Sequence, residues 1–169
     1  MKVLSIDVGI INLAICILDS HGSIEYWDVL NTQGLVDMIK RLDTDVPWYG
    51  VTNIVIEKQP SFNPKMRSIA SGLMTYFLVR GKLDSDQVDN LVEYSPKAKL
   101  LLCRDYSIAL SLKGSKRYRA HKKMAVEECR IRVSHDENLL NFYNQHKKKD
   151  DLADSYLQGV AYLREHGFT

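Results

Sequence analysis

Three separate stretches of the chain carry carboxylates in positions where they could do chemistry. Asp7 ends the apolar run Val3–Ile6, and Glu57 ends the apolar run Asn53–Ile56. Both runs are typical of buried strands, and an isolated buried carboxylate is costly unless it is paired or binds a metal. A third group of acids, Asp150–Asp154, opens a predicted C-terminal helix. Two strand-borne acids and a helical acid pair are the raw material of a divalent-metal site that hydrolyses phosphodiesters.

The helical acids share one face. Asp151 and Asp154 are three residues apart and Asp150 and Asp154 are four apart, so the register of the pair stays open by one residue. Such a cluster is destabilising unless the helix dipole and a bound cation compensate it. Mg²⁺ suits carboxylate and water ligands, with Mn²⁺ as a substitute. Two ions about 4 Å apart can activate water and stabilise the departing oxygen.

Each acid also has an ordinary structural interpretation. The Asp150–Asp154 run could simply cap a helix, and Glu57 could pair with Lys58 or with an arginine at the sheet edge. Asp7-Val8-Gly9 could be a strand-end turn or the first phosphate loop of an actin-like ATPase. Such ATPases usually need longer chains and further glycine-rich loops, which this sequence lacks.

The elements that must position these acids follow from hydrophobic patterning. The pattern predicts strands over Val3–Ile6, Ile10–Leu18, Ser23–Leu30, Asn53–Ile56 and Gln87–Tyr94. It predicts helices over Gln33–Leu42, Lys65–Val79, Lys122–Val133, Glu137–Gln145 and Asp150–Glu165, and a basic loop over Ser111–Ala120. This order favours an α/β, ribonuclease-H-like fold, in which a five-stranded mixed sheet (a three-stranded antiparallel meander plus parallel strands) is flanked by helices. That fold brings the ends of the first and fourth strands together near the start of the last helix.

Bulk composition narrows the class of protein. The 169 residues are 45% hydrophobic and 26% charged, typical of one globular domain spanning 1–169. The sequence contains no run of 18 apolar residues, so we expect no membrane span, and the N-terminus has no signal-peptide pattern. The cysteines Cys16, Cys103 and Cys129 are scattered without a CxxC pair, which disfavours a zinc site or disulfide framework and favours an intracellular protein.

Charge is unevenly distributed along the chain. Residues 1–57 hold 8 acidic residues against 3 Lys or Arg, and residues 150–169 hold 4 against 1. Residues 58–149 hold 19 Lys or Arg against 9 acidic residues. The basic middle could simply solvate helix faces. Because the acidic residues predict a site for phosphodiester chemistry, we interpret the basic region 58–149 as a surface that binds a polyanion.

Four ordered motifs carry a resemblance to a known family. They are Ser5–Gly9 with Asn12–Ala14, Ile54–Pro60 leading into Asn63–Lys65, Tyr94–Lys99, and Asp151–Asp154. The chain resembles the RuvC-like Holliday junction resolvases, and specifically their poxvirus branch.

The resemblance implies a set of catalytic residues. Four acids would bind metal, two ions per site: Asp7, Glu57, Asp151 and Asp154. A catalytic lysine, histidine in some members, would precede the last helix and stabilise charge at the scissile phosphate. Lys122 is the best match, Lys123 is nearly as good, and Lys99 is a weaker candidate. The stretch between Lys122 and Asp151 is long beside bacterial members.

The resemblance also implies binding partners. Branched DNA is the expected partner, and no membrane or small-molecule cofactor is expected. Phe62 would stack on an unpaired base, or alternatively pack at the core rim. A homodimer would use the apolar face of Lys65–Val79 (Ile69, Leu73, Tyr76, Phe77), unless that face only packs on the sheet. The DNA-binding candidates are Lys58, Phe62, Lys65, Arg67, Lys99, Lys116, Arg117, Arg119 and Lys123.

The expected activity is that of a Mg²⁺-dependent endonuclease that cuts four-way DNA junctions by paired nicks and processes viral concatemers in the host cytoplasm. A ribonuclease acting on structured RNA or RNA–DNA hybrid stays open as an alternative. So does a non-catalytic nucleic-acid scaffold, although the presence of all four acids argues against it.

Overall fold

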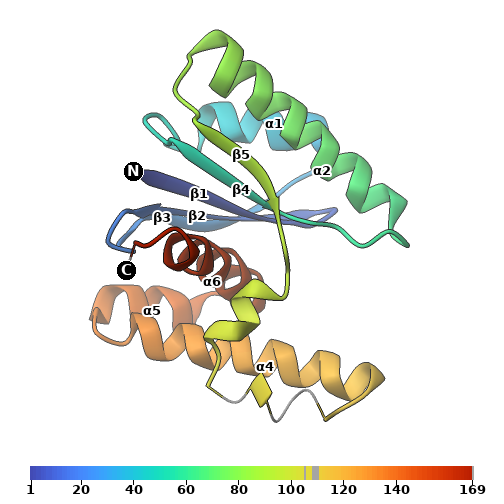
Figure 1. The fold of residues 1–169 in the computed structure, drawn as a ribbon, viewed down its shortest axis with the longest axis vertical. Helices are drawn as coiled ribbons and strands as arrows, with labels where there is room; N and C mark the ends of the chain where they lie inside the picture. The colour runs from blue at the N-terminus through green and yellow to red at the C-terminus, as the bar shows by residue number, and fades with distance from the viewer. Residues whose placement is uncertain (105, 108–110, 169) are drawn as a thin grey trace.

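A five-stranded mixed sheet in the order β3-β2-β1-β4-β5 forms the centre of the molecule (Figure 1). The structure is a computed structural model that describes residues 1–104, 106–107 and 111–168. The strands are β1 (Lys2–Val8), β2 (Asn12–Asp19), β3 (Ile24–Asn31), β4 (Asn53–Glu57) and β5 (Asn90–Tyr94). The first three form an antiparallel meander, and β4 and β5 are added in parallel to β1. The predicted sheet is confirmed.

Strand register brings the first two acids together. The parallel ladder between β1 and β4 pairs Ser5 with Val55 and Ile6 with Ile56. Asp7 and Glu57 are the next residues on their strands, so they lie at neighbouring positions at one edge of the sheet. Side chains alternate along a strand, so Asp7 points to the same face as Ser5, and Ile6 points to the other.

Helices cover both faces of the sheet (Figure 1). One layer contains α1 (Leu35–Thr44), α2 (Pro64–Phe77) and the π-helical continuation η1 (Leu78–Asp84). The other contains the 3₁₀-helical turn η2 (Ala98–Leu102), α4 (Gly114–Val133), α5 (Glu137–Gln145) and α6 (Lys149–Glu165). Each layer has its own apolar core, and α6 lies directly on β1 and β2. The acids on β1 and β4 therefore face α6.

The apolar face of α2 belongs to the core of this one chain. Ile69, Leu73, Tyr76 and Phe77 are at most 7% exposed and pack with the core beneath α1 and α2. The structure therefore has the predicted alternative, packing within the chain, for these four side chains, and a dimer interface on this helix stays a prediction. A face at helical spacing cannot by itself distinguish intramolecular from intermolecular burial.

The expected loop over Ser111–Ala120 is also wrong over most of its length, since α4 begins at Gly114. Arginine, lysine and alanine are good helix formers, and one turn further on Ala125 and Cys129 anchor the same helix in the core. The basic residues between Gly114 and Ala120 thus belong to the first turns of α4 and not to a loop. Within the described ranges, no helix is long and apolar enough to cross a membrane.

Candidate active site

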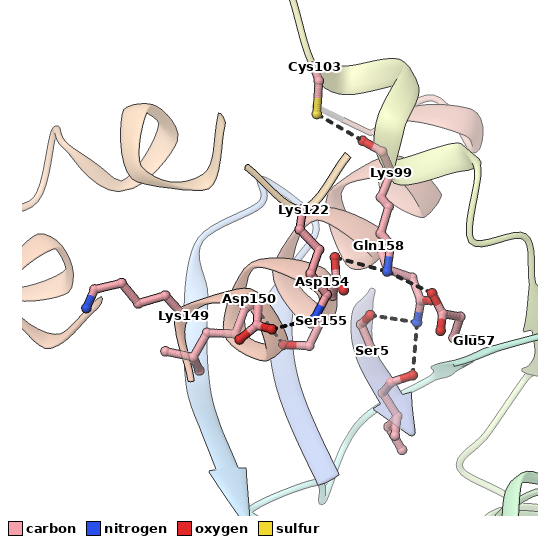
Figure 2. Close-up of polar contacts among 12 residues, drawn as sticks. Ser5, Glu57, Lys99, Cys103, Lys122, Lys149, Asp150, Asp154, Ser155 and Gln158 are labelled. Atoms are coloured by element: carbon pink, nitrogen blue, oxygen red, sulfur yellow. Dashed lines mark hydrogen bonds and ion pairs between the residues drawn. The ribbon is translucent and has the colours of Figure 1, made fainter. Parts of the chain in front are cut away.

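A buried lysine lies among the acids at the edge of the sheet. Nζ of Lys99 lies 2.7 Å from Oε1 of Glu57 and 3.1 Å from Oδ1 of Asp154 (Figure 2). The Lys99 side chain is only 8% exposed. Burial alone lowers the pKa of a lysine, but Asp154, Glu57 and Asp7 together raise the pKa of Lys99 above its ordinary value. The neighbouring acids therefore favour the charged form of this buried side chain.

The segment that follows β5 delivers this lysine. In Tyr94-Ser95-Pro96-Lys97, the backbone N–H groups of Ala98 and Leu100 donate to the carbonyls of Ser95 and Lys97 at 3.1 Å, which closes a 3₁₀ turn. Leu100 and Leu102 are buried on either side of the exposed Leu101. The turn is thus pinned to the core, and the Lys99 side chain extends from it toward the end of β4 (Figure 2).

The acids around Lys99 carry more negative charge than one lysine neutralises. Burial, and then the nearby Glu57 carboxylate, raise the pKa of Asp7 well above its ordinary value. Burial also raises the pKa of Asp154; Lys99 opposes the rise and Glu57 adds to it. A further cation would relieve this crowding.

A second lysine–acid pair lies closer to solvent. Nζ of Lys122 lies 2.6 Å from Oδ2 of Asp150, and it lies 5.4 Å from the centre of the Tyr118 ring. The two side chains are 41% and 31% exposed. Burial would raise the pKa of Asp150, but the bond and charge of Lys122 outweigh it and the pKa is lowered. Lys122 is thus engaged with the acid that the predicted metal set leaves out.

Asp151 belongs neither to the acids that contact Lys99 nor to the Lys122–Asp150 pair. Its carboxylate lies 4.0 Å from Nζ of Lys148, a weak contact. Burial and the neighbouring Asp150 raise its pKa. Asp151 lines the same cleft as Asp7, Glu57 and Asp154, so the structure gathers all four predicted acids around one cavity.

The cleft has a volume of about 1130 Å³ and a mixed lining. Its acidic floor, which holds Lys99, is bordered by basic and aromatic side chains from several elements: Lys58, Arg67, Tyr118, His121, Lys122 and Lys148. Ile10 and Ile11, from the turn between β1 and β2, complete one side. An acidic centre with a basic rim suits a phosphodiester substrate.

The remaining predicted DNA-binding residues lie outside this lining. Lys65, Lys116, Arg119 and Lys123 are exposed, and Arg117 bonds its Nε to the carbonyl of Leu112 at 2.6 Å. Phe62 is 86% exposed, so it does not pack at the core rim. The alternative pairing of Glu57 with Lys58 is replaced by the pair with Lys99.

The donor chemistry fits Mg²⁺, although the described residues include no group of three or more His, Cys, Asp or Glu arranged to hold a metal ion. Asp7, Glu57 and Asp154 present hard oxygen donors, and a cation, the Lys99 ammonium, already lies between two of them. Sequence reasoning ranked Lys99 below Lys122. The sequence marks a Tyr-Ser-Pro turn after the last predicted strand, but the place of Lys99 beside Glu57 and Asp154 follows only from the packing of that turn in the structure.

Several solved structures share this fold. A fowlpox virus resolvase in complex with Holliday junction DNA matches over 99% of both chains, with a TM-score of 0.67 and 18% identity. The yeast mitochondrial Holliday junction resolvase Ydc2 matches over 96% of this chain and 78% of its own, with a TM-score of 0.63 and 22% identity. Thermus thermophilus RuvC in complex with a Holliday junction covers 100% and 98%, with a TM-score of 0.63 and 13% identity. The fold is that of the RuvC-like resolvases, as the sequence motifs predicted.

The family follows from the sequence itself. The chain belongs to the family described as Poxvirus A22 protein, whose profile matches residues 1–166. It is also 35% identical over 136 residues to Uncharacterized protein L451 of Acanthamoeba polyphaga mimivirus, a match that covers 76% of this chain. The matched region is 33% of that relative, so this chain corresponds to about a third of its length.

Proposed function

We propose that this protein is a Mg²⁺-dependent endonuclease that resolves four-way DNA junctions by paired, symmetric nicks. The observation that carries the proposal is the buried Lys99 ammonium between Glu57 and Asp154, beside Asp7, on the floor of a cleft with a basic rim. Neither helix capping nor a structural ion pair accounts for so many uncompensated acids at one cleft. Family and fold support the same activity.

The four acids would hold the metal. Asp7, Glu57 and Asp154 supply oxygens from β1, β4 and α6, and Asp151 supplies one from the preceding turn of α6. A bound Mg²⁺ would supply an activated water and charge stabilisation at the departing 3′ oxygen, and we expect 5′-phosphate and 3′-hydroxyl ends. The acids would also orient the attacking water by accepting its hydrogen bonds.

Lys99 is the lysine that we expect to act on the phosphate. The surrounding acids raise the pKa of Lys99 and so favour its positively charged form. With those acids neutralised by metal, the ammonium would bind a non-bridging phosphate oxygen and stabilise the negative charge that develops there. Lys122, half-exposed and paired with Asp150, is better suited to contact a neighbouring phosphate.

The rim of the cleft would hold the DNA backbone. Lys58 and Arg67 approach from the β4–α2 side, and α4 presents Lys116, Arg119 and Lys123 to solvent. Phe62, almost fully exposed beside this path, would stack on a base left unpaired at the branch point. Contacts of this kind select shape rather than sequence.

Two such active sites are needed to cut a junction symmetrically, and a two-fold homodimer would provide them. The core face of α2 is not available. Leu78 and Val79, at 45% and 41% exposure, leave an apolar surface on η1, where α2 continues. In a poxvirus, the activity would serve to separate concatemeric replication products in the host cytoplasm.

A comparison of nucleic-acid substrates tests the proposed activity. Purified protein with Mg²⁺ would be offered a labelled four-way DNA junction, a linear duplex of the same sequence and an RNA–DNA hybrid. Preferential nicking of the junction supports the proposal. Equal cutting of the hybrid would make the protein a ribonuclease, and tight junction binding without cutting under Mg²⁺ or Mn²⁺ would leave a scaffold.

A further inference from the structure

Behind the acids, α6 is joined to the sheet by a row of polar contacts. Every fourth residue of the helix carries one: Asp154, Gln158 and Tyr162. Asp154 reaches Glu57 through Lys99, Gln158 donates to the carbonyl of Val55 at 3.2 Å, and the Tyr162 hydroxyl lies 3.0 Å from Oδ1 of Asn53. The strand partners are every second residue of β4.

The spacing of the two elements explains this row. Four residues of an α-helix advance about 6 Å, and two residues of a strand advance about 6.6 Å. Helix and strand run in opposite directions here, since the higher helix numbers meet the lower strand numbers. A one-residue slip of α6 would rotate all three polar groups away from β4 together.

Gln158 is the middle contact and the one that joins two strands. Its Nε2 lies 3.1 Å from Oγ of Ser5 (Figure 2). It also lies 3.1 Å from the carbonyl oxygen of Ile6, again on β1, besides the Val55 contact on β4. Ser5 is fully buried and Gln158 is 1% exposed. An amide this deeply buried among acceptors is costly to misplace.

These contacts are adjacent in sequence to the acids. Ile6 immediately precedes Asp7, Val55 lies two residues before Glu57, and Gln158 lies one helical turn after Asp154. One side chain of α6 therefore contacts both strands that carry the other acids around Lys99.

Close packing makes the contact possible. A Cβ atom placed on Gly159 would lie 2.8 Å from Cδ1 of Leu18 and 3.1 Å from Cβ of Ser5. The helix thus approaches β1 and β2 as closely as a glycine allows, and the neighbouring glutamine can reach the strand backbones.

We propose that Gln158 is a positioning residue for the acid site: it fixes the register of α6 on β1 and β4, and so the spacing of Asp154 from Asp7 and Glu57. The inference rests on the proposed function in that the acids are taken to hold a divalent cation. Gln158 itself touches neither metal nor DNA.

The test compares two substitutions that each remove a buried hydrogen bond from the same helix. Gln158→Met keeps the length and volume of the side chain but loses the amide, and Tyr162→Phe removes the contact to Asn53, farther from the acids. Both should lower stability to a similar extent. Only Gln158→Met should weaken Mn²⁺ binding to the protein without DNA, measured by calorimetry, by about 10- to 100-fold, as loss of supporting contacts does elsewhere.

A second readout is the Mg²⁺ concentration that gives half-maximal junction cleavage, which should rise for Gln158→Met and stay constant for Tyr162→Phe. Unchanged Mn²⁺ affinity in folded Gln158→Met protein, or an equal loss in Tyr162→Phe, would overturn the inference. If Gln158→Met does not fold, Gln158→Asn, which keeps the amide but is too short to span both strands, should weaken binding in the same direction, and wild-type affinity there would also overturn it. If the wild-type protein binds Mn²⁺ but cuts no junction, the proposed function fails while the binding comparison still tests Gln158.

Discussion

Lys99 and Glu57, 42 residues apart in the sequence, form an ion pair of 2.7 Å in which neither side chain is more than 16% exposed. Surface ion pairs contribute little, but breaking a buried pair leaves an uncompensated charge behind. This pair also connects η2 to the end of β4. We therefore expect a change at this pair to affect both stability and the proposed activity.

Replacing Lys99 with Met should reduce single-turnover junction cleavage by about 100- to 1000-fold, because a preorganised cation in the transition state is lost. The variant should also unfold more easily, since Glu57 and Asp154 lose their partner. Lys122→Met is the matched control, and we expect less than about a tenfold loss there, because we propose that Lys122 contacts phosphate only in the ground state. A larger defect in Lys122→Met than in Lys99→Met would exchange the two roles.

Asp7→Asn should stabilise the metal-free protein while abolishing cleavage. The raised pKa of Asp7 means that the folded state holds this proton more tightly than the unfolded state. Stability from this group is present at low pH and is lost as pH rises through the folded-state pKa, because a charged carboxylate buried beside Glu57 costs free energy. The amide removes this cost, and the melting temperature at pH 7.5 should rise by about 2–4 °C, the shift for about 1 kcal/mol in a chain of this size.

With added Mg²⁺, we expect the wild type to have a higher melting temperature than Asp7→Asn. Binding to the folded state should stabilise the wild type in proportion to metal concentration and stabilise Asp7→Asn much less. A wild-type melting temperature that does not change with Mg²⁺ concentration would contradict a metal site at these acids.

The sequence predicted the strands and helices that carry the four acids because these elements depend on local pattern, and the structure places all four acids around one cleft. Apolar runs that end in Asp7 and Glu57 define two strands, and the spacing of Asp151 and Asp154 defines a helix face. It could not rank the lysines, since the position of Lys99 depends on how η2 packs against α6. It also missed Gln158, because a glutamine inside an apolar helix has no signal of its own until its partners, two strand carbonyls, are located.

Phe62→Ala should lower affinity for a four-way junction by about 1–3 kcal/mol and leave duplex affinity nearly unchanged, because only the junction offers an unpaired base for stacking. The side chain is 86% exposed, so the substitution should not affect folding. Equilibrium binding to both DNAs, with Ca²⁺ in place of Mg²⁺ to prevent cutting, makes the comparison. Equal losses for both DNAs would mean that Phe62 has no role at the branch point.

The exposed basic residues of α4 should act through phosphate contact alone. Lys116→Ala combined with Arg119→Ala should weaken binding to junctions of any sequence to a similar extent. It should also reduce the slope of log affinity against log salt concentration by about 2, one for each contact removed. Salt titrations of wild type and double variant measure this slope. An unchanged slope would mean that α4 lies away from the DNA.

The most direct test of the central claim is a cleavage time course on a four-way junction labelled on each strand in turn, with wild type and Asp154→Asn side by side. The acid centre predicts two symmetric nicks on opposite strands, with ends that a ligase can reseal, in the presence of Mg²⁺. It predicts that Asp154→Asn binds the junction as tightly as wild type and cuts neither strand. Cleavage that persists in folded Asp154→Asn protein would show that the chemistry lies elsewhere and would contradict the account.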